Sequence, residues 1–287
     1  MKATAALGGN AYYKIGALVA ILVSLIWLRQ PSVDNVDPDT ERNVTEIIAD
    51  KGYLAQEYVV TTRDGYVLPL QRVPYGRDEL RSSTHRPQPG PPVILMHALL
   101  FSSYVWVVNG PDQSLPYVLA DAGFDVWLGN VRGNSQARHV NYTFYQKELW
   151  DFSLEEMSNY DVPDTIDFVL NVTGHNKTFI IGHSMGAATT LGLLSEKPEY
   201  NDKILLFMAM APAVRIHTMK SQIRHVLPFM DELATLGALF GRYDFLYHDR
   251  MIDFIAENLV PLSRCAGLFV PGSLTSPPVN LLNPSMR

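Results

Sequence analysis

The feature that most constrains the fold of this chain is a serine flanked by glycines, placed between a strand-like and a helix-like segment. Residues 182–186 read Gly-His-Ser-Met-Gly. The apolar run 178–181 predicts a strand directly before them, and the small-residue run 187–194 predicts a helix directly after them. Such a strand–turn–helix holds its serine in a strained backbone at a helix N-terminus, where developing negative charge is favoured. We therefore predict Ser184 as a nucleophile, with Gly182, His183 and Gly186 shaping the turn.

The remaining sequence alternates between the two kinds of segment. Strand-like runs are followed by amphipathic or small-residue runs, and Arg63-Asp64-Gly65 is typical of a hairpin turn. This alternation predicts an α/β fold with a mostly parallel sheet. The predicted strands are 55–62, 66–73, 93–96, 124–128, 179–181 and 204–210. The predicted helices are 44–51, 115–122, 154–169 (with Pro163 as a kink or restart) and 187–196.

A second loop supplies the other half of a candidate site. The buried strand 93–96 is followed by His97-Ala98-Leu99-Leu100. An oxyanion hole needs two backbone N–H groups. Met185, directly after the nucleophile, is the first expected donor, and Leu99 is the second. We interpret His97 as a structural histidine that bonds loop backbone.

The N-terminus has the pattern of a targeting segment. Residues 15–28 are apolar and uncharged, with Lys2 and Lys14 before them and Arg29 after them. This is typical of a secretory signal within residues 1–30, although no small-residue cleavage site follows. An uncleaved membrane anchor is the alternative, because residues 11–28 approach the roughly 20 residues of a bilayer span. Either interpretation places the protein in the secretory pathway, as a secreted, lysosomal or membrane-anchored lumenal protein.

Other composition features agree with that compartment. Four N-x-[ST] sequons predict a glycoprotein, at Asn43, Asn141, Asn171 and Asn176. The single cysteine, Cys265, excludes a disulfide framework and a cysteine-based zinc site. The net charge of −6 argues against general nucleic-acid binding.

Several longer stretches together resemble the acid lipase family of α/β-hydrolases, which includes gastric and lysosomal acid lipases and insect lipase 3-like proteins. They are TTRDGYVLPLQRVPYG (61–76), LMHALLFSSYVWV (95–107), LADAGFDVWLGNVRGN (119–134), ELWDFSLEEMSNYDVPDTIDFVL (148–170) and FIIGHSMGAATTLGLL (179–194). The resemblance implies an α/β-hydrolase fold with a helical cap, and hydrolysis of fatty-acyl esters such as triglycerides or sterol esters at a lipid–water interface. It also implies Ser184 as nucleophile, Leu99 and Met185 as oxyanion donors, and neither a metal nor an organic cofactor.

Ala98 departs from the family pattern, which usually has glycine after the histidine. If this position needs a positive φ, alanine is strained there by roughly 1 kcal/mol or more. We therefore expect a tilted Leu99 amide.

The acid and base of a triad are the second departure. In this fold they follow the serine, in the order acid and then histidine. The later histidines, His217, His225 and His248, all fall in the cap-like region. Asp244 and His248 have the right order, but their spacing places them on one helical face instead of two loops. We identify no triad Asp or His.

The missing triad partners suggest that the last strands of the fold are absent and that an apolar sheet edge is exposed. The chain would then be a truncated or alternatively spliced product, or its sequence would come from an incomplete gene model. A catalytically inactive, lipase-like lipid-binding or membrane-anchored protein is the alternative function. The expected organisation is a signal or anchor (1–30), linker (31–43), hydrolase core (44–213), helical cap (214–264), and partial return with an irregular tail (265–287).

Overall fold

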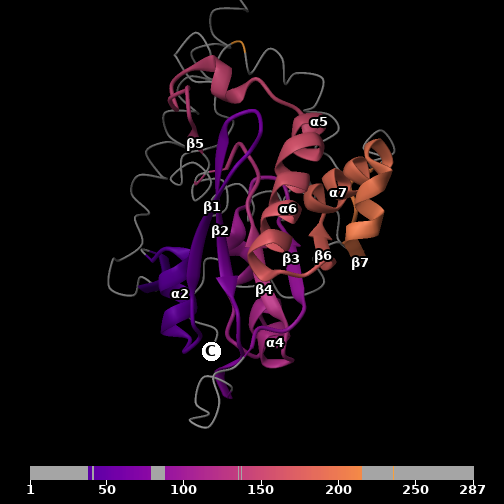
Figure 1. Ribbon diagram of the computed structural model, residues 1–287. Coiled ribbons are helices and arrows are strands. Elements are labelled where there is room, and N and C mark those ends of the chain that lie inside the picture. The colour runs from indigo at the N-terminus through magenta and orange to yellow at the C-terminus, as the bar shows by residue number, and fades with distance from the viewer. Residues whose placement is uncertain are drawn as a thin grey trace, which may run out of the picture.

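The computed structural model describes residues 38–40, 42–78, 88–134, 136, 138–214 and 235 (Figure 1). The predicted signal or anchor 1–30, including residues 11–28, lies outside these residues. So do the tail 265–287 and the predicted cap 214–264, apart from Val214 and Thr235. In the described part of the chain, no helix is both long enough and apolar enough to cross a membrane.

The described residues form one mixed sheet of seven strands. Its order is β1-β2-β4-β3-β6-β7, and the short β5 pairs with β2. The strands around β3 run parallel, whereas β2 is antiparallel to β1, β4 and β5. The strands are β1 (Gln56–Thr61), β2 (Tyr66–Val73), β3 (Pro92–Met96), β4 (Asp125–Gly129), β5 (Arg138–His139), β6 (Thr178–His183) and β7 (Ile204–Met210).

Helix α2 precedes the first strand, the other helices lie between strands, and several helix termini carry recognisable signals. Asn43 caps the first of them with a reciprocal capping box to Glu46, and Gly174 ends α6 in the left-handed conformation. The α-helices are α2 (Val44–Asp50), α4 (Leu115–Asp121), α5 (Leu154–Glu156), α6 (Val162–Thr173) and α7 (Met185–Glu196). Short 3₁₀ turns are η2 (Pro38–Thr40), η3 (Ser103–Trp106), η4 (Lys147–Trp150) and η6 (Pro198–Lys203).

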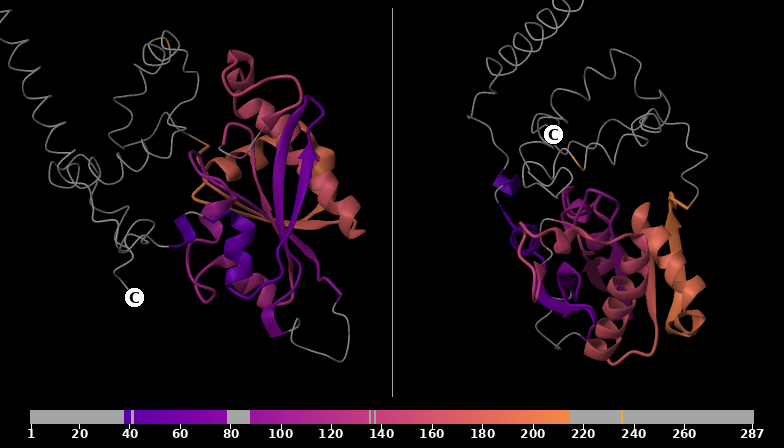
Figure 2. Two further views of the ribbon diagram at one scale, coloured as in Figure 1. Left: turned by 90° about the vertical axis from the view of Figure 1, so that its left-hand side faces the viewer. Right: turned by 90° about the horizontal axis from the view of Figure 1, so that it is seen from above.

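The sheet has a hydrophobic core on each face, so helices cover both of its sides (Figure 2). Alternate residues of β3 serve the two cores: Ile94 packs with α6 and α7, and Leu95 packs with α2 and α4. All five residues of β3 are buried. A strand buried on both faces reads as a continuous apolar run, which is why Val-Ile-Leu-Met predicts it.

The predicted helix 154–169 is in fact divided. A π-helical segment, η5 (Met157–Asp161), separates α5 from α6. Pro163 lies in the first turn of α6, where its missing N–H is tolerated, so the predicted restart is confirmed. The π segment itself leaves no sequence signal that we recognised.

Strand β7 is the last strand in the order and carries exposed apolar side chains. Leu205, Leu206, Met208 and Met210 are each between 40% and 55% exposed. Among the described residues, β7 is therefore an edge strand with apolar side chains exposed.

Candidate active site

Ser184 lies at the junction of β6 and α7. Its backbone has φ 51° and ψ −106°, a conformation that a non-glycine residue rarely adopts. The Ser184 N–H donates to the Met210 carbonyl oxygen at 2.9 Å, so the neighbouring strand β7 holds the turn. Met185 begins the 12-residue helix α7, and the serine therefore sits at the positive end of that helix.

Two glycines allow the close packing of this turn. A Cβ atom on Gly182 would lie 2.7 Å from the Cα and N atoms of Ala187. A Cβ atom on Gly186 would lie 2.5 Å from the Met96 carbonyl oxygen. Both glycines have ordinary negative φ angles, so close backbone approach, and not a left-handed conformation, requires them here.

Strained backbone gathers at one edge of the sheet. Three non-glycine residues of the described chain have positive φ: Leu100, Ser184 and Ala211. They follow the carboxyl ends of β3, β6 and β7, which are neighbours in the sheet. The chain leaves β3 toward β4 on one side and later returns as β6 on the other, so this edge is a topological switch point. Strain of this kind clusters at functional sites, so this edge is the candidate site.

The loop after β3 forms a tight turn over residues 98–101. The Phe101 N–H donates to the Ala98 carbonyl oxygen at 3.2 Å, and Leu100, at the third position, has φ 65°. A positive φ at the third position is typical of a type II turn. The expectation of strain at Ala98 is therefore wrong. Ala98 opens the turn with a negative φ, and the left-handed residue is Leu100, two positions later.

The two candidate oxyanion donors belong to segments that touch. The Gly186 N–H donates to the His97 carbonyl oxygen at 3.1 Å and so joins the start of α7 to the loop after β3. Within the described residues, the N–H groups of Leu99 and Met185 donate to no protein acceptor. Both groups therefore remain candidate donors to an oxyanion.

His97 is a buried, neutral histidine, only 1% exposed. Its Nδ1 lies 2.9 Å from the Ala98 carbonyl oxygen, which can only accept, so Nδ1 carries the proton. Its Nε2 accepts from the Val131 N–H and from Asn134 Nδ2, each at 3.4 Å. Burial lowers the pKa of His97 to about 4, so the ring stays neutral near neutral pH. Its contacts are those of a histidine that bonds loop backbone.

No hydrogen-bonded proton acceptor for Ser184 is identified among the described residues. In the portion of the chain that the structure describes, no histidine is hydrogen-bonded to the Ser184 hydroxyl. His183 is half-buried at the end of β6 and pairs in register with Met210. The candidates Asp244 and His248, like His217 and His225, lie outside the described residues.

The turn after β3 carries three exposed apolar side chains. Leu99 is 61% exposed, Leu100 is 50% exposed and Phe101 is 40% exposed. All three belong to the turn 98–101 that carries the Leu99 amide. Such a cluster of exposed large apolar residues is typical of a binding surface for an apolar ligand.

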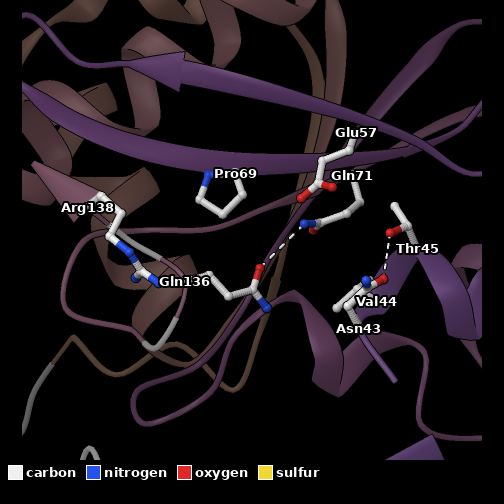
Figure 3. A pocket seen from close by; sticks show the side chains of 8 residues that line it. All are labelled: Asn43, Val44, Thr45, Glu57, Pro69, Gln71, Gln136 and Arg138. Carbon is white, nitrogen blue, oxygen red and sulfur yellow. Dashed lines mark hydrogen bonds between the residues drawn. The ribbon is translucent and has the colours of Figure 1, made fainter. Parts of the chain in front are cut away.

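A separate pocket of about 300 Å³ lies between the N-terminus of α2, strands β1 and β2, and the segment that runs from the end of β4 into β5 (Figure 3). Its lining includes Glu57, Gln71, Gln136 and Arg138, and Gln71 Nε2 donates to Gln136 Oε1 at 3.4 Å. No residue of the turn 182–186 lines it. The described residues hold no cluster of His, Cys, Asp or Glu suited to a metal ion.

The sequence model of the α/β hydrolase fold matches residues 91–259, more than half of the chain. The chain belongs to the α/β-hydrolase family. A second family model, the partial α/β-hydrolase lipase region, matches residues 44–110. The two matches together cover both the loop after β3 and the Ser184 turn.

The α/β-hydrolase relatives of this chain include acid lipases. Human lysosomal acid lipase/cholesteryl ester hydrolase is 40% identical over 227 residues, covering 78% of this chain and 55% of the relative. Rat gastric triacylglycerol lipase is 39% identical over 226 residues, covering 78% and 55%. Mouse lipase member M is 39% identical over 240 residues, covering 80% and 55%. The chain thus spans about half the length of the curated relatives it matches.

The four sequon asparagines are all exposed. Asn43 is the N-cap of α2, and its Oδ1 accepts from the Glu46 N–H at 2.9 Å and from Thr45 Oγ1 at 2.6 Å. Asn141 lies in the loop after β5, and Asn171 and Asn176 flank the C-terminal end of α6.

Proposed function

We propose that this α/β-hydrolase cleaves fatty-acyl esters, with Ser184 as the nucleophile. The observation that carries the proposal is the strained Ser184 backbone at the switch-point edge of the sheet, beside a second loop that presents the Leu99 amide. The names of the relatives, which include a cholesteryl ester hydrolase and a triacylglycerol lipase, support a lipid ester as substrate.

The geometry suggests how the residues share the work. The Ser184 oxygen adds to the carbonyl carbon of the ester, and the carbonyl oxygen takes negative charge. The N–H groups of Leu99 and Met185 bind that oxygen, and the positive end of α7 stabilises the charge. The alcohol then leaves with a proton, and water hydrolyses the acyl-serine. The base that accepts the Ser184 proton is not assigned to a described residue.

The exposed apolar turn after β3 supports an acyl chain as the ligand. Leu99, Leu100 and Phe101 expose apolar surface after β3, the strand that neighbours β6, and such surface suits a hydrocarbon chain and not a charged group. We propose triglyceride or sterol ester as the natural substrate class, bound at a lipid–water interface.

We further propose a secretory-pathway protein that is secreted, lysosomal or attached to a membrane. The apolar segment 11–28 would act as signal or anchor, and Asn43, Asn141, Asn171 and Asn176 would carry glycans. Expression in animal cells tests this. Enzymatic deglycosylation should lower the apparent mass in four steps, each removed by one Asn→Gln change. A protein whose mass does not change on deglycosylation would refute the proposed location.

Hydrolysis of p-nitrophenyl esters of increasing acyl length tests the reaction, with Ser184→Ala as the control. The proposal predicts turnover that rises with chain length and is lost in Ser184→Ala. Turnover that Ser184→Ala retains would refute it.

A second candidate function is lipid binding without catalysis. It is favoured by the absence, among described residues, of a histidine bonded to Ser184. This function predicts binding of a fluorescent fatty-acid analogue by a folded protein that hydrolyses no ester.

A further inference from the structure

The turn that presents the Leu99 amide is held at both ends by the loop after β4. At its start, His97 Nε2 accepts from the Val131 N–H and from Asn134 Nδ2, each at 3.4 Å. At its end, the Ser103 N–H donates to Asn130 Oδ1 at 2.9 Å, and Asn130 Nδ2 donates to Ser103 Oγ at 3.0 Å. The position of residues 98–102 therefore depends on the loop of residues 130–134.

Asn130 is the centre of this contact. It is 1% exposed, and its Oδ1 also accepts from Asn134 Nδ2 at 2.8 Å. Its Nδ2 donates to the Pro69 carbonyl oxygen at 3.0 Å and to Gln71 Oε1 at 3.3 Å. Gln71 in turn bonds Gln136 at the pocket of Figure 3. A buried amide satisfied on every side has one orientation, so the loop is rigid where it meets Ser103.

Arg132 fixes the same loop to the rest of the fold. Its backbone N–H, Nε and Nη2 donate to the Asp161 carboxylate at 2.8, 2.9 and 2.7 Å. Its Nη1 and Nη2 donate to Asp64 at 2.6 and 2.9 Å. The guanidinium carbon lies 3.9 Å from the centre of the Tyr66 ring. Arg132 is 2% exposed and Asp161 is 0% exposed, so these bonds are shielded from water.

The two carboxylates that bind Arg132 belong to two different elements of the fold. Asp64 lies in the hairpin turn between β1 and β2, and Asp161 ends the π segment η5. That segment packs closely on α7, because a Cβ atom on Gly192 would lie 2.6 Å from Ser158 Oγ. Burial raises the pKa of Asp161 to about 6, and its bonds to Arg132 oppose that rise. Arg132 thus joins η5, which packs against α7, to the loop after β4 that holds the Leu99 turn. Met185 is the first residue of α7.

We propose that Arg132 is a positioning residue that sets the separation of the two oxyanion donors by fixing residues 130–134. The inference rests on the proposed function, because it assigns Leu99 and Met185 as those donors. Arg132 touches neither Ser184 nor the Leu99 turn, and it acts through Asn130, Asn134 and His97.

The substitution Arg132→Lys tests the role while keeping the charge. Lysine offers a point charge in place of the planar fork that meets Asp64 and Asp161 together. The loop should then lose its fixed position although the positive charge remains.

Arg72→Lys is a matched control. Arg72 is also buried, and it meets Asp125 through Nε and Nη2 at 2.7 and 2.9 Å, with its guanidinium 4.7 Å from the Trp127 ring. Asp125 begins β4, whereas the Arg132 loop follows the end of that strand, so the control pair lies at the opposite edge of the sheet. Both variants should lose comparable stability.

The readout is phosphonylation of Ser184 in the full chain by an alkyl fluorophosphonate, below the melting temperature of both variants. Arg132→Lys should lower kinact at least 10-fold with KI unchanged, and Arg72→Lys should change neither constant more than twofold. Equal kinact values for the two variants would overturn the positioning role. A drop confined to KI would overturn it as well.

Hydrogen exchange separates a failure of this inference from a failure of the proposed function. If wild-type Ser184 does not react, the proposed hydrolysis fails, but exchange of the peptide spanning residues 97–103 still reports on the turn. Arg132→Lys should speed that exchange at least 10-fold relative to Arg72→Lys. Equal exchange rates of this peptide in the two variants would overturn the positioning role of Arg132.

Discussion

Gly186→Ala is predicted to damage both the fold and the site through one added methyl group. The new Cβ atom would meet the Met96 carbonyl oxygen at 2.5 Å, the Met96 carbonyl carbon at 2.7 Å and the His97 carbonyl oxygen at 2.8 Å. These are backbone atoms at the end of β3 and cannot rotate away. Ordinary contact begins near 3.4 Å, so α7 must move by almost 1 Å. Overpacking of this kind lowers the unfolding free energy by about 1 to 3 kcal/mol. The better helix propensity of alanine offsets about 1 kcal/mol of that loss.

The same movement shifts the Met185 amide relative to the Leu99 amide. A misplacement of about 1 Å at a catalytic group lowers a rate by roughly 100-fold. We therefore expect Gly186→Ala to lose up to about 2 kcal/mol of unfolding free energy in urea and to slow Ser184 phosphonylation about 100-fold.

Gly110→Ala provides the control for this prediction. No heavy atom lies within 4 Å of a Cβ atom built on Gly110, and its φ is not in the left-handed range. We expect unchanged labelling, with the unfolding free energy unchanged or raised by up to about 1 kcal/mol. If Gly186→Ala matched Gly110→Ala in both assays, the proposed contact between α7 and β3 would be refuted.

Three further predictions concern strain, pH and the turn after β3. Ser184→Gly should be more stable than Ser184→Ala by roughly 1 kcal/mol in urea unfolding, because only glycine relaxes at φ 51°; equal stabilities would argue against backbone strain. Leu100→Gly should likewise have an unfolding free energy about 1 kcal/mol higher than that of Leu100→Ala, because Leu100 has φ 65°. Equal melting temperatures of the two variants would contradict this. Burial lowers the pKa of His97 from 6.5 to about 4, so its neutral form contributes stability that is complete above about pH 6.5 and is lost as the pH falls toward 4. Wild type should therefore lose about 2 to 3 kcal/mol more than His97→Asn between pH 7 and pH 4.5, and parallel pH profiles would contradict the assignment.

The sequence predicts the sheet well where local patterns decide structure. Continuous apolar runs predict β3 and β7, and Arg63-Asp64-Gly65 predicts the antiparallel pair of β1 and β2, all as observed. Local patterns do not predict the division of the helix expected over residues 154–169. Residues 154–169 have helical spacing throughout, and the π segment at Met157–Asp161 arises where Asp161 bonds Arg132, 29 residues earlier in the chain. Patterns along the chain do not reveal such long-range contacts.

The site is predictable to a similar extent. The G-x-S-x-G motif indicates where Ser184 lies, and the strand–loop order indicates Leu99. The substituted glycine at Ala98 suggests a positive φ there, whereas the turn places the positive φ at Leu100. The segment Gly-Asn-Val-Arg-Gly-Asn (129–134) is a sequence signal for the supporting residues Asn130 and Arg132. Arg132 lies between Gly129 and Gly133, just after the buried strand β4, so its side chain has few routes to solvent.

The most direct test of the account locates the covalent adduct of an alkyl fluorophosphonate on the folded 287-residue chain by peptide mass spectrometry. The account predicts one adduct, on Ser184, that is lost in Ser184→Ala and in urea-unfolded protein. An adduct on another residue would contradict it. So would the absence of any adduct from a sample that unfolds cooperatively.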